Sequence, residues 1–206
     1  VSLVVCFHGA EPAASTLRLR EEFTVAANRQ QDVKMNVPQQ VYILSRAQIE
    51  RANAQTAADL LTTDGLLTVQ KSQQGGGSPM IRGFESSRVL LVMDNVKMNN
   101  LIYRAGHLQN IITVDPSILE RVEVLYGPSS VSYGSDALGG VVAFRSKNPV
   151  LGDGGKTLFS GNAFMRYGSA NQETTGHVDF NIGGERFASL TSLSYSNFGD
   201  LRSGRR

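Results

Sequence analysis

One block of sequence, residues 121–144, limits the possible folds more than any other part of the chain. It begins with Arg-Val-Glu-Val, in which Val122 and Val124 alternate with the charged residues Arg121 and Glu123. That period is typical of a β-strand with one buried face. A Gly-Pro pair and a loop of small residues follow, and a second apolar run closes the block. The block therefore predicts two strands joined by a compact turn.

Two consecutive glycines, Gly139 and Gly140, precede the second of these strands. A glycine adopts backbone conformations that other residues avoid, and its missing side chain lets another segment approach closely. We expect at least one of these two reasons to apply here.

Composition favours a β-rich protein and argues against a nucleic-acid partner. The 206 residues carry a net charge of +2 and no concentrated basic patch. Glycine is frequent, at 21 residues, tryptophan is absent, and only 18% of the residues are charged, which is typical of strands joined by many turns. No stretch approaches the roughly 18 apolar residues of a membrane-spanning helix.

Cysteine and histidine usage gives no sign of a local cluster of metal ligands. Cys6 is the single cysteine, which excludes an intrachain disulfide and a multi-cysteine metal site. The three histidines, His8, His107 and His177, are too far apart in sequence to form a local metal-binding pair.

The sequence also predicts no enzyme. Residues 154–157, Gly-Gly-Lys-Thr, resemble the end of a phosphate-binding loop, but Val150 occupies the position of its first glycine. We find no Gly-x-Ser-x-Gly nucleophile turn and no cysteine–histidine pair that would support covalent catalysis.

Two short helices are predicted by the residues that cap them. Ser45 and Gln48 have the spacing of a capping box, which indicates a helix that starts at Ser45. Thr56 and Asp59 repeat the spacing, so a second helix is expected to follow and to end near Gly65.

A covered strand and a third short helix are expected further along. Residues 89–93 are apolar at every position, which favours a central strand of a sheet covered on both faces. Asp94 and Asn95 are expected to turn the chain. Asp115 and Pro116 are typical of the start of a helix, with proline at the first helical position.

Three segments near the C-terminus, residues 157–167, 174–184 and 187–198, alternate between apolar and polar residues. Segments of about ten residues with this period, separated by short turns, are typical of a transmembrane β-barrel, although a soluble antiparallel meander would give the same pattern. In the second segment the apolar residues Val178, Phe180 and Ile182 fall on one face of the expected strand. The polar residues His177, Asp179 and Asn181 fall on the other face.

Four of these features, in this order, resemble the plug domain of TonB-dependent outer-membrane receptors. They are the capped helix at Ser45, the triplet Ile-Arg-Gly at residues 81–83, the strand and turn of residues 89–96, and residues 121–144. Asn95 stands where the family usually has glycine, and asparagine also tolerates a left-handed turn. The resemblance implies an α+β plug domain, a small mixed β-sheet with short helices, followed by the first antiparallel strands of a truncated transmembrane β-barrel. Receptors of this kind have about 22 strands around a plugged lumen.

The resemblance also implies a division of the chain. Residues 1–20 would be the tail of an N-terminal β extension found in Bacteroidetes-type receptors, with a signal-peptide remnant and a plain buried strand as alternatives. Residues 21–30 would hold the TonB-box region, residues 31–149 the plug, and residues 156–206 the first, incomplete set of barrel strands.

The implied function is energised uptake across the cell outer membrane. Its partners would be TonB, with its inner-membrane energising complex, and the lipid of the outer membrane. A TonB box pairs its backbone with the edge of a partner's sheet, so it needs β-formers and little else. The resemblance places this box at Glu22, Phe23, Thr24, Val25 and Ala26.

The loop around residues 100–110 resembles the apical loop of haem receptors in the family, and its candidate ligand-binding residues are Tyr103, Arg104, His107 and Gln109. A neutral imidazole can ligate haem iron, an arginine can pair with a propionate, and a tyrosine can stack on the porphyrin or ligate its iron. Haem is therefore the first candidate for the transported ligand, with His107 as its iron ligand. No intrinsic cofactor is expected.

Two alternatives stay open at this point. The ligand could be a siderophore or cobalamin instead of haem. The chain could also belong to a non-transporting, β-rich ligand-binding module. A reading frame that continues for several hundred residues of alternating strands would favour the transporter.

Overall fold

The structure is a computed structural model, and it describes residues 2–8, 24–25, 32–33, 40–71, 77–84, 88–98, 110–128, 133–152, 156–169 and 171–200. The chain forms two compact units. The first consists of residues 1–17 and 147–206, and we call it the strand unit. The second consists of residues 18–146, and we call it the sheet-and-helix unit.

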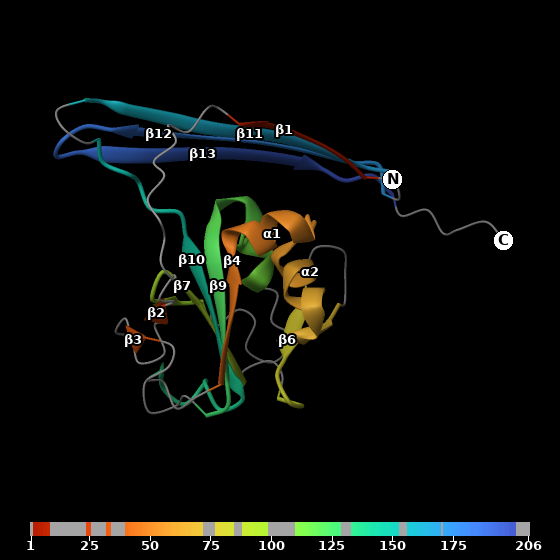
Figure 1. Cartoon of the computed structure of the whole chain (residues 1–206). Helices are drawn as coiled ribbons and strands as arrows, with labels where there is room; N and C mark the ends of the chain where they lie inside the picture. The colour runs from red at the N-terminus through yellow and green to blue at the C-terminus, as the bar shows by residue number, and fades with distance from the viewer. Residues whose placement is uncertain are drawn as a thin grey trace. The chain divides into compact units, whose positions relative to one another are not determined.

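A five-stranded mixed sheet is the centre of the sheet-and-helix unit (Figure 1). Its spatial order is β4-β9-β10-β7-β8, in which β10 and β7 are parallel and the other neighbours are antiparallel. Residues 89–93 form β7, which is paired on both sides and buried on both faces from Val89 to Val92, as predicted for a covered interior strand; the middle strand of the five is β10. The strands are β4 (Gln40–Ser45), β7 (Val89–Met93), β8 (Val96–Lys97), β9 (Leu119–Tyr126) and β10 (Gly140–Ser146).

Short helices cover one face of this sheet, and their starts agree with the sequence. The backbone N–H and the hydroxyl of Ser45 both donate to Gln48 Oε1 at 2.9 Å, so α1 (Arg46–Ala52) begins with the predicted glutamine contact. Thr56 Oγ1 accepts from the Asp59 N–H at 3.1 Å at the start of α2 (Ala57–Thr62). The described residues also include the 3-10 helices η2 (Thr63–Gly65), η5 (Asn110–Thr113) and η6 (Pro116–Ile118).

Both faces of the five-stranded sheet are covered by apolar side chains. On one face, Val122, Val124 and Phe144 of the sheet lie in one cluster with Leu60 and Leu61 of α2. The burial of such side chains, worth about 1.5–3 kcal/mol each, is the main stabilising term for a unit of this size.

The opposite face is covered by the loop that joins β9 to β10. Tyr133 and Ala137 of this loop pack with Leu90, Leu125 and Val141 of the sheet. The prediction of a half-buried strand at residues 121–124 is therefore wrong, because Val122, Glu123 and Val124 are all buried, so both faces of the strand are covered. Glu123 is fully buried on that strand.

Both reasons expected for glycine at positions 139 and 140 apply: the close approach of another segment and a backbone conformation that other residues avoid. A Cβ on Gly139 would overlap the side chain of Phe84, and its own N–H donates to the Arg88 carbonyl at 2.8 Å. Gly140 has a φ of 154°, and a Cβ there would crowd the Leu125 carbonyl. The glycines therefore allow close approach at the point where β10 enters the sheet.

Two small strand pairs also lie in the described part of the sheet-and-helix unit. β5 (Thr68–Gln70) pairs with β6 (Ser78–Met80), and β2 (Thr24–Val25) pairs with β3 (Asp32–Val33), both antiparallel. The expected turn between β7 and β8 is confirmed, since Asp94 and Asn95 have φ values of 46° and 69°.

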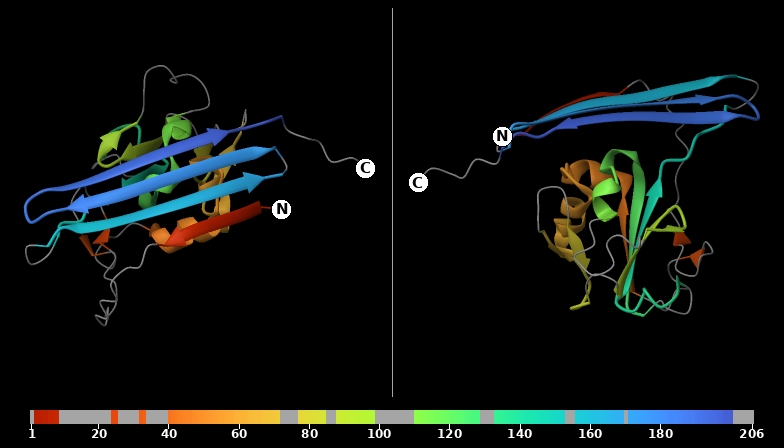
Figure 2. Two further views of the ribbon diagram at one scale, coloured as in Figure 1. Left: turned by 90° about the horizontal axis from the view of Figure 1, so that it is seen from above. Right: turned by 180° about the vertical axis from the view of Figure 1, so that it is seen from behind.

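The strand unit is a four-stranded antiparallel sheet with the order β1-β11-β12-β13 (Figure 2). Its strands are β1 (Ser2–His8), β11 (Leu158–Gly168), β12 (Glu173–Gly183) and β13 (Ala188–Asn197). The last three match the alternating segments of the sequence, and β1 pairs with β11 over its whole length. The fold is thus the expected one: an α+β unit with a mixed sheet and short helices, followed by antiparallel strands.

Candidate functional site

The segment that holds the expected ligand-binding residues leaves the sheet after Met98. The Met98 N–H donates to the Leu91 carbonyl at 2.9 Å, and β8 runs antiparallel to β7, so the chain leaves toward the Val89 end of β7. The segment returns at Ile111, which is fully buried. The four candidate residues Tyr103, Arg104, His107 and Gln109 lie between these points, outside the described residues.

The end of the sheet toward which this segment leaves is defined by the strand register. Gly140 pairs with Val89 on one side and with Tyr126 on the other, and Tyr126 pairs with Gln40. Four strands therefore bring these residues to one edge of the unit.

A tight turn places a cation at this same end. Ile81 and Phe84 exchange both backbone hydrogen bonds, at 2.9 and 2.8 Å. Between them, Arg82 and Gly83 have φ values of 50° and 83°, as a type I′ turn requires. The Arg82 guanidinium donates to Gln40 Oε1 at 2.9 Å and lies 5.7 Å from the centre of the Tyr126 ring. An exposed positive charge thus sits beside an aromatic face.

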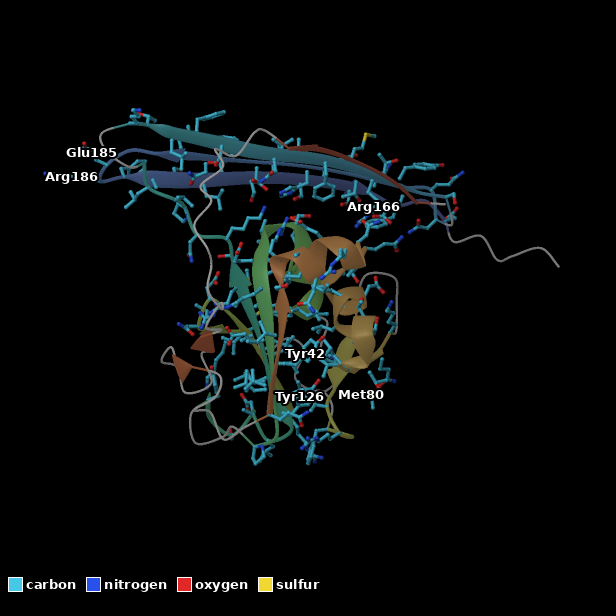
Figure 3. The ribbon with its side chains drawn as sticks, in the orientation of Figure 1. Tyr42, Met80, Tyr126, Arg166, Glu185 and Arg186 are labelled. Atoms are coloured by element: carbon cyan, nitrogen blue, oxygen red, sulfur yellow. The ribbon has the colours of Figure 1, made fainter. Side chains whose placement is uncertain are left out.

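Tyr126 is itself fixed by a second contact. Its hydroxyl donates to the Leu66 carbonyl at 2.9 Å. Burial raises the pKa of the Tyr126 phenol, the nearby Tyr42 raises it further, and the charge of Arg82 opposes both. Figure 3 shows Tyr42 and Tyr126 close together on the neighbouring strands β4 and β9. The phenol is therefore held neutral, as a hydrogen-bond donor must be.

The expected TonB box is described only in part. Thr24 and Val25 form β2, with Thr24 opposite Val33 and Val25 opposite Asp32. The other three residues of the box, Glu22, Phe23 and Ala26, lie outside the described residues. The backbone of the described part is extended and paired, which is the conformation that exchange with a partner strand requires.

The alternation of the C-terminal strands separates two chemically different faces, as the sequence predicts. One face is polar and buried along β12, and the other carries apolar side chains that are exposed. Exposed fractions on the apolar face reach 71% for Phe159, 57% for Met165 and 75% for Leu193. An exposed apolar face of this extent is typical of a surface that meets lipid or a partner.

A buried polar network lies on the other face, around Asp179. Lys147 Nζ is 2.6 Å and His177 Nε2 is 3.1 Å from Asp179 Oδ2, and Asn162 donates to the second oxygen at 3.3 Å. The other ring nitrogen of His177 is 2.6 Å from Ser194 Oγ. His177 is thus a structural member of this network, in line with its predicted place on the polar side of the strand.

A second buried ion pair lies further along the same face. Arg166 donates to Glu173 Oε1 from Nε at 3.1 Å and from Nη2 at 2.6 Å, and the Thr175 hydroxyl donates to the same oxygen at 2.9 Å. Figure 3 labels Arg166 on β11. Sequence reasoning missed both ion pairs, although the polar parity of β12 was visible, because each partner comes from a different segment.

The described residues give no candidate for a metal centre or a membrane-spanning helix. No group of three or more histidine, cysteine, aspartate or glutamate side chains is placed to hold a metal ion within the ranges that the structure describes. Among these same residues, no helix is both long enough and apolar enough to cross a bilayer.

Comparison with known proteins gives one family. The TonB-dependent receptor plug domain matches residues 33–141. The chain is 32% identical over 137 residues to the vitamin B12 transporter BtuB of Vibrio vulnificus (strain YJ016), a match that covers 65% of this chain and 22% of that protein. The BtuB of strain CMCP6 is 35% identical over 134 residues, covering 63% and 21%. The chain thus spans about a fifth of the length of these relatives.

Solved structures with a similar fold include outer-membrane receptors for different ligands. The pyoverdine outer membrane receptor FpvA of Pseudomonas aeruginosa PAO1 superposes with a TM-score of 0.59 at 17% identity, over 84% of this chain and 30% of that one. The hemophore receptor HasR of Serratia marcescens, bound to its hemophore and heme, gives 0.58 at 25% identity, over 80% and 25%. The relatives are transporters and receptors. The haem-receptor subgroup and the Bacteroidetes type stay predictions.

Proposed function

Since the chain belongs to the TonB-dependent receptors and carries their plug domain, we propose that it serves the energised uptake of a large ligand across the outer membrane. Its location is the outer membrane of the cell, as the sequence predicts. The uptake would require the remaining strands of a barrel, because the four antiparallel strands described in the strand unit form an open sheet and not a closed one.

One observation carries this proposal: strands with two chemically different faces follow the plug directly. Along β12, Val178, Phe180 and Ile182 are between 38% and 50% exposed, while His177, Asp179 and Asn181 are at most 5% exposed. A strand of a transmembrane barrel needs apolar side chains toward lipid and polar side chains toward the interior. A soluble binding module has no need of an apolar exposed face of this size, so the observation favours the transporter over that rival.

The coupling to TonB would use the segment around β2. Thr24 and Val25 already lie in an extended conformation paired with β3. We propose that TonB replaces β3 as the partner of this strand and pulls on the N-terminal end of the plug. Backbone hydrogen bonds would supply the affinity, which explains why the box of residues 22–26 needs so little sequence specificity.

The proposed first ligand is haem. The support is chemical and comes from the sequence: Tyr103, Arg104, His107 and Gln109 combine an iron ligand, a porphyrin-stacking ring, a cation for a propionate and an amide within seven residues. The segment leaves the sheet at the end that also holds Arg82 and Tyr126. A second cation and a second aromatic ring therefore lie at the end of the sheet toward which the segment leaves.

Cobalamin is the second candidate. It is supported by the identity of 32% and 35% to two proteins described as vitamin B12 transporters. Siderophores form the third class, supported by a shared fold alone.

A haemin titration followed by absorbance separates these ligands. We expect the full-length receptor to give a saturable Soret shift that is lost in His107→Ala and kept in His8→Ala, the matched histidine control. Equal shifts in all three proteins would remove His107 from the site. If haemin gives no shift and cyanocobalamin binds with saturation, the ligand is cobalamin; if neither binds, a ferric siderophore is the ligand to test next.

A further inference from the structure

The segment that links the plug to the barrel strands is fixed to β12 at three successive points. Lys147 Nζ pairs with Asp179 Oδ2 at 2.6 Å. The backbone of Val150 both donates to and accepts from the Asn181 side chain, each at 3.0 Å. The Gly152 N–H then donates to the Gly184 carbonyl at 3.1 Å.

Apolar packing does not explain this attachment. The side chains of Val150 and Leu151 are 56% and 52% exposed, so little of their surface is removed from water. The ion pair is much better shielded, with exposed fractions of 14% for Lys147 and 6% for Asp179. Directed polar contacts therefore hold the segment.

Two glycines make the close approach of the segment to β12 sterically feasible. A Cβ on Gly183 would overlap the Val150 carbonyl oxygen and would come within 2.9 Å of the Gly152 nitrogen. A Cβ on Gly152 would lie 2.8 Å from the Gly183 carbonyl oxygen. Neither glycine has a positive φ that would require it for conformational reasons. The missing side chain of Gly183 thus allows two backbones to meet, and that of Gly152 allows contact both with Gly183 and with the Lys156 carbonyl in its own turn.

Ser146, the residue just before this segment, is hydrogen-bonded within the sheet-and-helix unit. Asp94 Oδ1 accepts from the Ser146 N–H at 3.0 Å, and Asp94 Oδ2 accepts from its hydroxyl at 2.7 Å. Ser146 is the last residue of the sheet-and-helix unit, and Lys147 is the first residue of the linker in the strand unit. Asp94 therefore binds Ser146 within the sheet-and-helix unit, and Asp179 binds the next residue, Lys147, within the strand unit.

We propose that residues 147–152 form an anchor that fixes the exit of the plug to β12, so that any displacement of the plug ends at Ser146. The anchor consists of the Lys147–Asp179 ion pair, the Val150–Asn181 contacts and the glycine approach at Gly152 and Gly183. Its role in transport rests on the function proposed above. When TonB pulls the N-terminal end of the plug, the anchor keeps the chain that follows its C-terminal end attached to β12.

Hydrogen exchange in urea, measured by mass spectrometry on the full-length receptor in detergent, tests the anchor directly. We expect the Val150 and Gly152 amides to stay protected at urea concentrations at which the amides of β7 and β9 already exchange. In Gly183→Ala these two amides should exchange about tenfold faster, the factor expected from the loss of about one hydrogen bond. Gly176→Ala, on the same strand with open space around its Cβ, should leave their exchange unchanged.

Two results would overturn the anchor. The first is loss of protection at Val150 and Gly152 at the same urea concentration as at β7 and β9 in the unmodified receptor. The second is exchange at these amides that is equal in Gly183→Ala and Gly176→Ala. If Gly183→Ala does not assemble, Asn181→Leu provides the same test at the Val150 amide alone. The exchange measurement needs neither ligand nor TonB. It therefore tests the anchor even if the receptor proves not to transport a ligand.

Discussion

The hydroxyl of Tyr126 donates a hydrogen bond of 2.9 Å to the carbonyl of Leu66, which ties the end of β9 to the chain just before β5. Tyr126 belongs to the block of sequence that first indicated the fold, and Leu66 follows the second helix. The contact therefore joins β9 to the chain that follows α2, two parts of the plug that are 60 residues apart in sequence.

This contact predicts a pH dependence of plug stability. Burial and Tyr42 raise the pKa of Tyr126 above its ordinary value of 10.0, against the opposing charge of Arg82. A group with a raised pKa in the folded state contributes its stability fully below the unfolded pKa and loses it as the pH rises through the folded pKa. We expect the plug to lose stability above about pH 10 through this residue, since a phenolate cannot donate to Leu66.

The matching variant is Tyr126→Phe, measured by hydrogen exchange of β9 amides in the receptor. It should cost about 1 kcal/mol at neutral pH, the net value of one hydrogen bond. It should also show a smaller loss of stability above pH 10 than the unmodified protein. If both proteins lose the same amount of stability above pH 10, deprotonation of the Tyr126 phenol does not destabilise the plug.

Alanine should cost more stability at a glycine in a packed contact, such as Gly139, than at a glycine in an open turn, such as Gly65. Gly139→Ala should destabilise the plug by about 1–3 kcal/mol, because the new Cβ overlaps the Phe84 side chain in a packed site. Gly65→Ala introduces no contact within 4 Å and meets only the strain of its φ of 67°, about 1 kcal/mol. Urea unfolding followed at plug amides compares the two. Equal losses would show that Phe84 moves aside freely.

The buried carboxylate of Glu123 predicts a strong dependence on its cation. Arg121 Nε lies 2.8 Å from Glu123 Oε1, and the glutamate side chain is fully buried while the arginine is 27% exposed. Arg121→Met should cost about 3 kcal/mol, because a buried charge loses a partner. Arg51→Met, at an exposed helix position, should change stability by less than about 0.5 kcal/mol. Similar small effects of both variants in urea unfolding would contradict the pairing.

The TonB-box proposal predicts a separation of binding from uptake. Val25→Pro removes a backbone N–H and should abolish TonB-dependent uptake while ligand affinity stays unchanged. Val25→Ala keeps the N–H and should retain most of the uptake. Cell-associated ligand measured with and without TonB distinguishes the two steps. Uptake by the proline variant at the unmodified rate would place the TonB contact elsewhere.

Local features of the fold were predictable because their causes are local. The caps at Ser45, Thr56 and Asp115 depend on side chains that bond to backbone groups within three residues. The turn at Asp94 depends on a left-handed backbone conformation that aspartate and asparagine tolerate. The alternation of β12 depends on its two environments alone. These elements could therefore be read from short windows of sequence.

The features that sequence analysis missed depend on distant segments. Glu123 is fully buried on the face of the sheet where Tyr133 and Ala137 pack with Leu125, which no pattern within β9 indicates. Lys147 and Asp179 are 32 residues apart and meet only because the linker crosses β12. The order of the sheet also depends on a parallel pairing of β7 and β10 that long-range packing decides.

The most direct test of the central claim is ligand uptake by the full-length receptor in isogenic cells with and without TonB, using haemin, cyanocobalamin and a ferric siderophore. We expect one of the three to accumulate only when TonB is present, and surface binding of that ligand to persist in its absence. If a ligand accumulates equally without TonB, or if none accumulates although the receptor is present in the outer membrane, the assignment of energised uptake is wrong.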